Sequence, residues 1–153
     1  SSLPITTIED AYRAIDWYTC RWICEDYNQG VKTGCRVEHS QLDDGADIQR
    51  LLGFLIPAAV RLLQVRQAAR HSPDMPATKM VDPLMVTMLA RRQNKNEVTM
   101  TVGEFLAGVA ALGGHLGRRG DGPPGWRTLW RGWLHLSDLT DGARLFLQDR
   151  NPF

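Results

Sequence analysis

The stretch that decides the fold is IQRLLGFLIPAAVRLLQVRQAAR, residues 48–70. Its large apolar residues recur every three or four positions, which predicts a long amphipathic helix. Pro57 lies inside this helix and removes one backbone hydrogen bond, so we expect a kink there. Between Arg50 and Ser72 there are four arginines and no acidic residue, which predicts a positive face. The apolar positions of the pattern are Ile48, Leu51, Leu52, Leu55, Ala59, Leu62 and Leu63.

The same helical spacing precedes this stretch, where it predicts another amphipathic helix from about Thr7 to Gln29. Thr7 and Asp10 have the spacing of a capping box at its start. On the other side, the segment from His71 to Thr78 contains two prolines and reads as a linker between two subdomains.

Three further helices are expected after the linker. Asp82-Pro83 has the pattern of an N-cap followed by proline at the first helical position, and that helix should end near Arg92. Thr101 and Glu104 predict a capping box, and Gly113-Gly114 closes the helix that follows. A last helix runs from Trp126 to about Gln148. No convincing alternating β pattern is present, so the sequence predicts an all-α chain.

Composition excludes several classes of protein. The chain has 153 residues, 43% hydrophobic and 23% charged, which is typical of one globular domain. Its net charge of +1 gives no argument for nucleic acid or membrane, and its longest apolar run is shorter than the roughly 20 residues of a membrane span. Three cysteines favour a reducing compartment, the cytoplasm by default. The start Ser1-Ser2-Leu3-Pro4 has no Met, so we expect the chain to be cut from a longer reading frame.

One stripe, on one face of the helix predicted from about Thr7 to Gln29, carries residues that could take part in catalysis or binding. Tyr18, Arg21, Glu25 and Lys32 fall within an arc of about 60° if the helix continues through Gly30. A carboxylate can hold a divalent cation, and the flanking donors suit phosphate oxygens, so the stripe favours phosphodiester chemistry. The alternative interpretation is a solvated helix face with an ordinary ion pair.

The stripe resembles the Tyr-Arg-Glu-Lys signature of bacterial insertion-sequence transposases of the cut-and-paste, DDE type. The surrounding string YTCRWICEDYNQGVKTGCRVE, the later AVRLLQVRQ and the late LGGHLGRRGDGPPGWRTLWRGW also look like the C-terminal third of that family. Three blocks in the right order make the resemblance specific, and it covers most of the chain.

The resemblance implies a helical end of an RNase H-like catalytic core over residues 1–72, followed by a helical dimerisation and DNA-contact domain over 79–153. Glu25 would be the third carboxylate of the catalytic triad and would help to bind two Mg²⁺ or Mn²⁺ ions. Tyr18, Arg21 and Lys32 would contact transposon-end DNA. The two aspartates of the triad would lie upstream of this chain, which alone should be inactive and bind no metal. In the intact bacterial, cytoplasmic protein, a homodimer would cleave and join DNA at transposon ends.

Two other interpretations stay open. The chain could be a non-catalytic helical module that binds DNA or dimerises, such as a truncated inhibitor of the full enzyme. Alternatively, C-x3-C-x10-C-x3-H could hold a structural zinc ion through Cys20, Cys24, Cys35 and His39.

Aromatic and basic residues near the C-terminus also have two interpretations each. Trp126, Trp130 and Trp133 have helical spacing and are either local core or a dimer surface. Arg118 and Arg119, in a glycine-rich loop, either track DNA phosphates or are solvated. Arg127 and Arg131 would extend the same basic patch.

Overall fold

The computed structural model describes residues 4–35, 40–42 and 44–149 and shows a helical protein. In the described part, β structure is limited to an isolated bridge between Pro76 and Thr101. The predicted all-α class is therefore confirmed. The elements are α1 (Ile8–Thr19), α2 (Arg21–Gln29), the π-helix η1 (Gly30–Gly34), α3 (Gly45–His71), the 3-10 helix η3 (Ala77–Lys79), α4 (Pro83–Arg92), α5 (Val102–Leu112) and α6 (Trp126–Asp149).

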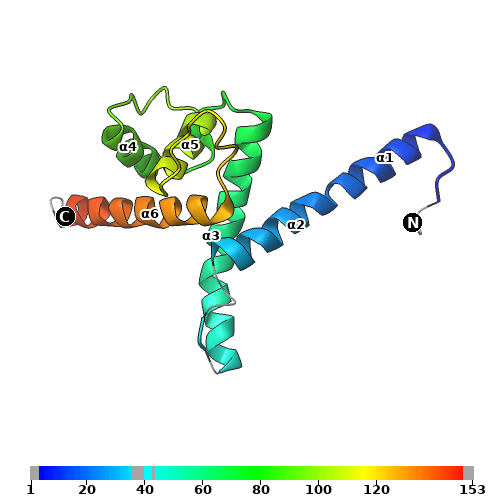
Figure 1. Ribbon diagram of the computed structural model, residues 1–153, viewed down its shortest axis with the longest axis horizontal. Helices are drawn as coiled ribbons and strands as arrows, with labels where there is room; N and C mark the ends of the chain where they lie inside the picture. The colour runs from blue at the N-terminus through cyan, green and yellow to red at the C-terminus, as the bar shows by residue number, and fades with distance from the viewer. Residues whose placement is uncertain (1–3, 36–39, 43, 150–153) are drawn as a thin grey trace.

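The long helix α3 lies at the centre of the molecule, and the other helices extend from its two sides (Figure 1). Helices α4, α5 and α6 gather on one side of its C-terminal half and form a small globular body. Helices α2 and α1 leave the other side of α3 and extend away as an arm. No side chain of α1 or α2 is buried.

The hydrophobic core lies where α3, α4, α5 and α6 meet. Phe105 is fully buried, and its ring meets the edge of Trp133 at a centroid distance of 6.5 Å. Trp126, Trp130 and Trp133 are all buried in this core, so the local-core interpretation of the tryptophans is confirmed. Because Leu62 and Val65 of α3 belong to the same cluster, the core joins both sides of the predicted linker. The division into domains at that linker stays a prediction.

Among the described helices, α3 is long and apolar enough to cross a membrane by length and composition. The core helix of a globular domain passes the same test, so this finding is weak evidence for a membrane span. The C-terminal half of α3 contributes four buried side chains to the core, Ala59, Leu62, Leu63 and Val65.

Helix α5 approaches α6 very closely at a pair of glycines. A Cβ atom added to Gly132 would overlap the carbonyl oxygen of Val109, and one added to Gly113 would overlap the carbonyl oxygen of Thr128. The backbones of the two helices therefore touch at this crossing. Arg131 donates from Nε to the carbonyl oxygen of Gly113 at 2.7 Å and closes the end of α5.

The predicted helix starts are confirmed. Thr7 and Asp10 form a capping box, as do Thr101 and Glu104. Asp82 is the N-cap of α4, and its carboxylate accepts from the backbone N–H of Leu84, two residues later; Pro83 is the first residue of the helix. Asp44 caps α3 in the same way, and α3 continues through Pro57 as one helix.

The predicted single helix from Thr7 to Gln29 is wrong in one respect, because it breaks at Cys20 into α1 and α2. The carbonyl oxygen of Asp16 accepts from the Thr19 hydroxyl at 2.6 Å and from Cys20 Sγ at 3.4 Å. These side chains compete with the backbone for one acceptor, which weakens the helix at that turn. The chain then continues past Gln29 as the π-helix η1.

The two capping boxes give a matched test of which helices belong to the cooperative core. We expect Thr101→Ala to lower the free energy of unfolding by about 1 kcal/mol, because it removes the cap of a helix with five buried residues. Thr7→Ala removes the same kind of cap from α1. Because α1 has no buried residues, this variant should leave the unfolding midpoint unchanged. Urea unfolding followed by circular dichroism measures both, and equal losses would contradict this assignment.

The capping box of Thr101 and Glu104 also has an expected pH dependence. The backbone N–H of Thr101, and then Lys95, hold the pKa of Glu104 below its usual value in the folded state. A carboxylate with a lowered folded pKa stabilises the protein above its unfolded pKa and loses that contribution as the pH falls. The difference in the free energy of unfolding between wild type and Glu104→Gln, which removes the titrating carboxylate, should therefore shrink on acidification through the normal range of a glutamate.

Candidate functional site

The structure brings together three of the four residues in the predicted stripe. Arg21 donates from Nη2 to Glu25 Oε1 at 2.5 Å across one turn of α2. The Arg21 guanidinium carbon also lies 5.9 Å from the ring centroids of both Tyr18 and Trp22. The Glu25 side chain is 43% exposed, so its carboxylate is oriented by Arg21 but remains open to solvent.

Lys32 lies in η1, beyond the end of α2. The predicted arc assumed α-helical rotation through Gly30, and a π-helix rotates less per residue, so that angle does not describe Lys32. Gly30 and Gly34 are the buried residues of η1, while Lys32 is exposed. A Cβ on Gly30 would lie 3.2 Å from the Trp126 ring, so η1 packs directly against the start of α6.

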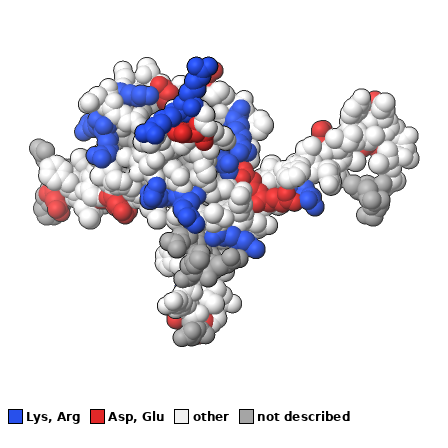
Figure 2. Space-filling view, in the orientation of Figure 1, with Lys and Arg blue, Asp and Glu red and all other residues white. Residues whose placement is uncertain are grey.

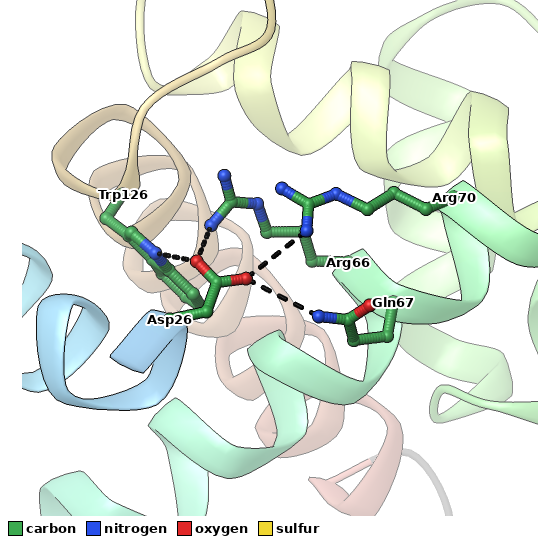
Figure 3. A network of polar contacts seen from close by, with 5 residues as sticks. All are labelled: Asp26, Arg66, Gln67, Arg70 and Trp126. Carbon is green, nitrogen blue, oxygen red and sulfur yellow. Dashed lines mark hydrogen bonds and ion pairs between the residues drawn. The ribbon is translucent and has the colours of Figure 1, made fainter. Parts of the chain in front are cut away.

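The most connected polar group near Glu25 is its neighbour Asp26 (Figure 3). Asp26 Oδ1 accepts from Arg66 Nη1 at 2.6 Å and from Trp126 Nε1 at 2.9 Å. Its Oδ2 accepts from Arg70 Nη1 at 3.4 Å and from Gln67 Nε2 at 3.5 Å. One carboxylate on α2 thereby joins α3 and α6.

Arg66 is the less exposed of the two arginines in this network, with a side chain that is 13% exposed against 48% for Arg70. Its guanidinium carbon lies 4.7 Å from the Trp126 ring centroid, which adds a cation–π contact. Burial lowers the pKa of Arg66, and the Asp26 carboxylate opposes that shift while Arg70 adds to it. An arginine stays charged at neutral pH in such surroundings, so the charge of Asp26 is needed to balance it.

Asp26 follows Glu25 directly in the sequence, and no motif there assigns it a role. Its partners Arg66, Arg70 and Trp126 are 40, 44 and 100 residues away. No local spacing rule connects residues that far apart, so the network becomes visible only in the folded chain.

A surface pocket of about 640 Å³ lies between α2 and α3. Glu25, Asp26 and Gln29 line it from α2, and Arg70 and His71 line it from α3. The pocket therefore has acidic residues on one wall and basic residues on the other, and Glu25 is one of the acidic residues.

The predicted basic loop is only partly free to bind DNA. Arg118 and Arg119 are exposed between α5 and α6, and the Arg118 backbone N–H donates to Asp121 Oδ2 at 2.8 Å. Arg127 is exposed as well, whereas Arg131 is bound to the end of α5. In Figure 2, basic side chains gather over the globular body, and the outer part of the arm carries few charges.

The described residues contain no group of three His, Cys, Asp or Glu side chains that could hold a metal ion. Cys20 and Cys24 are exposed, and Cys35 is half-buried. Burial raises the pKa of Cys35 to about 11, which opposes the thiolate form that binds zinc. The fourth predicted zinc ligand, His39, lies outside the described residues.

Comparison with protein families decides the identity of the globular body. Residues 58–149 match the family model of the Tn5 transposase dimerisation domain. The chain belongs to this family. The match begins in α3, one residue before the first buried side chain of that helix, and ends at the last residue of α6.

The match to the Tn5 transposase dimerisation domain divides the site between two parts of the chain. Arg66, Arg70 and Trp126 lie within the matched segment, whereas Tyr18, Arg21, Glu25 and Asp26 precede it. The family assignment thus supports a C-terminal region of a transposase, and the Asp26 network is where that region contacts the helix that carries Glu25.

Proposed function

We propose that the chain is the C-terminal part of a bacterial, cytoplasmic DDE transposase that cleaves and joins DNA at transposon ends. The observation that carries this proposal is the junction itself. A transposase dimerisation domain packs directly against a helix on which Glu25 lies exposed beside Arg21 and Tyr18. Those are three residues of the Tyr-Arg-Glu-Lys signature in the expected order.

Glu25 would act as one of three metal-binding carboxylates. It is the exposed acid of this constellation, and by the resemblance to DDE transposases the other two would lie upstream of this chain in the parent enzyme. When bound, two Mg²⁺ or Mn²⁺ ions would activate the attacking oxygen and stabilise the leaving oxygen of a phosphodiester. Tyr18, Arg21 and Lys32 would hold the DNA backbone, and Arg118 and Arg119 would add phosphate contacts.

The arm supports the proposal that an RNase H-like core packs against this chain. Helix α1 has 12 residues, which is marginal for a helix without a partner. Its large apolar side chains recur at helical spacing and are more than half exposed. We expect the catalytic core to cover this face, which carries Ile8, Tyr12 and Ile15 and continues to Trp22.

The far end of α6 supports dimerisation. After Thr140, no side chain in the described part of α6 is buried. Leu145, Phe146 and Leu147 are 65%, 60% and 54% exposed, and three consecutive helical residues point in directions about 100° apart. They leave apolar surface on more than one side of the helix end, and a second copy of this chain would cover part of it. They also lie within the matched dimerisation segment, unlike the apolar face of α1.

We expect Leu145→Asp to weaken self-association by at least about tenfold, because one buried leucine is worth about 1.5–3 kcal/mol. Val98→Asp is the matched control, since Val98 is 80% exposed in the loop between α4 and α5 of the same segment. Sedimentation velocity over a concentration series measures both. A monomeric wild type, or equal weakening by the two variants, would contradict the assigned surface.

The catalytic role is tested in the parent enzyme with transposon-end DNA. We expect Glu25→Gln to abolish cleavage of this DNA and to leave its binding intact.

The second candidate function is a non-catalytic module that dimerises or binds ends and inhibits the full enzyme. Its support is that the matched family is a dimerisation domain. Both functions predict a dimer, and only the first predicts that Glu25 is needed for strand cleavage.

A further inference from the structure

We propose that Asp26 is a positioning residue, which fixes the helix bearing Glu25 to the dimerisation domain. The proposal rests on the proposed function for the role of Glu25, while the clamp itself is a property of this chain. The Asp26 clamp comprises Asp26 of α2, Arg66 and Arg70 of α3, and Trp126 of α6 (Figure 3).

The clamp uses both oxygens of one carboxylate. Arg66 and Trp126 donate to Oδ1, and Arg70 donates to Oδ2, so the carboxylate plane is held from two helices at once. The side chains of Asp26 and Arg66 are 14% and 13% exposed, which limits screening of their charges by water. An ion pair this well shielded from water is held more firmly than the exposed pair of Arg21 and Glu25.

Trp126 holds the arm at two successive turns. Its Nε1–H binds Asp26, and its ring lies against Gly30, four residues further along. Gly30 is buried, and a Cβ there would already be 3.2 Å from three atoms of the ring. One side chain of the dimerisation domain thus fixes both the position and the rotation of α2.

Rotation of α2 decides where Glu25 points. Adjacent residues on a helix are about 100° apart, so clamping Asp26 sets the direction of the Glu25 side chain. Displacement of a catalytic group by about 1 Å can reduce the rate by about 10²-fold. A carboxylate that acts with two others from elsewhere in the enzyme depends strongly on such alignment.

The distance between α2 and the globular body tests the clamp directly. Spin labels on Cys24 of α2 and on an Arg92→Cys variant of α4 report it, with Cys20 and Cys35 replaced by serine. We expect a single narrow distance distribution in this doubly labelled chain. Asp26→Asn keeps the shape of the side chain and removes its charge, and it should broaden the distribution. Asp82→Asn is the matched control, because Asp82 also bridges to an arginine of α6, Arg144, without touching α2.

Circular dichroism checks that each variant is folded. If Asp26→Asn unfolds the chain, Trp126→Phe keeps an aromatic ring, removes one donor to Asp26, and should also broaden the distribution. A narrow distribution in a folded Asp26→Asn variant overturns the proposal, as does equal broadening by Asp82→Asn. Broadening confirms the clamp whether or not the parent is a transposase, since no catalysis is measured.

In the parent enzyme, we expect Asp26→Asn to lower the cleavage rate by about 10–100-fold with end binding and dimerisation unchanged. Asp82→Asn should leave all three unchanged. If Glu25→Gln has no effect on cleavage, the proposed function fails and this second experiment no longer bears on the clamp. If Glu25→Gln abolishes cleavage and Asp26→Asn leaves it intact, the positioning role is wrong.

Discussion

Replacing Gly132 with alanine is expected to lower the free energy of unfolding by about 3 kcal/mol or more, at or above the upper end for an overpacked core. The added Cβ would overlap the carbonyl oxygen of Val109, and it would also approach the backbone nitrogen of Gly113. Both atoms belong to the backbone of the neighbouring segment, so no side-chain rotation relieves the overlap. Helices α5 and α6 would have to separate, and their separation opens the core around Phe105 and Trp133.

The matched control for this prediction is Gly142→Ala on the same helix. A Cβ on Gly142 meets no atom within 4 Å, so alanine there gains only helix propensity and should stabilise by about 0.5–1 kcal/mol. Thermal unfolding followed at 222 nm should show the midpoint fall by about 10 °C or more for Gly132→Ala and rise slightly for Gly142→Ala. Equal midpoints for the two variants would show that the helices do not cross in backbone contact.

The helix positions could be predicted because their signals are local. Thr101 with Glu104, and Asp82 with Pro83, satisfy backbone groups within a few residues of themselves, so their spacing alone locates a helix start. The exposed pair of Arg21 and Glu25 follows from the same rule, since residues four apart on a helix are neighbours.

The joints between helices could not be predicted, because they depend on competition and on distant partners. Near Cys20, two side chains and a backbone N–H compete for the carbonyl oxygen of Asp16. The spacing of apolar residues gives no sign of this competition. At Gly30 the chain becomes a π-helix where it packs against Trp126, nearly 100 residues away. The same long separation hid the network of Asp26, which the sequence placed next to the catalytic candidate without a role.

The second large effect concerns Glu25. Glu25→Gln keeps the size of the side chain and an oxygen that can accept from Arg21, but it removes the negative charge. A carboxylate that holds divalent metal in a phosphodiester reaction cannot be replaced by an amide without loss of that metal, so we expect cleavage to fall by about 10³-fold or more. End binding should be retained, because Tyr18, Arg21 and Lys32, the proposed DNA contacts, are unchanged.

Metal-dependent cleavage of a transposon-end duplex by the parent enzyme is the decisive test of the role proposed for Glu25. Glu9→Gln is the matched control, since Glu9 is an exposed acid in the first turn of α1, away from Arg21. We expect the Glu25→Gln enzyme to bind the end without cutting it, and the Glu9→Gln enzyme to cut like wild type. Cleavage by Glu25→Gln at the wild-type rate would contradict this role and would leave the chain as a dimerisation module without a catalytic residue.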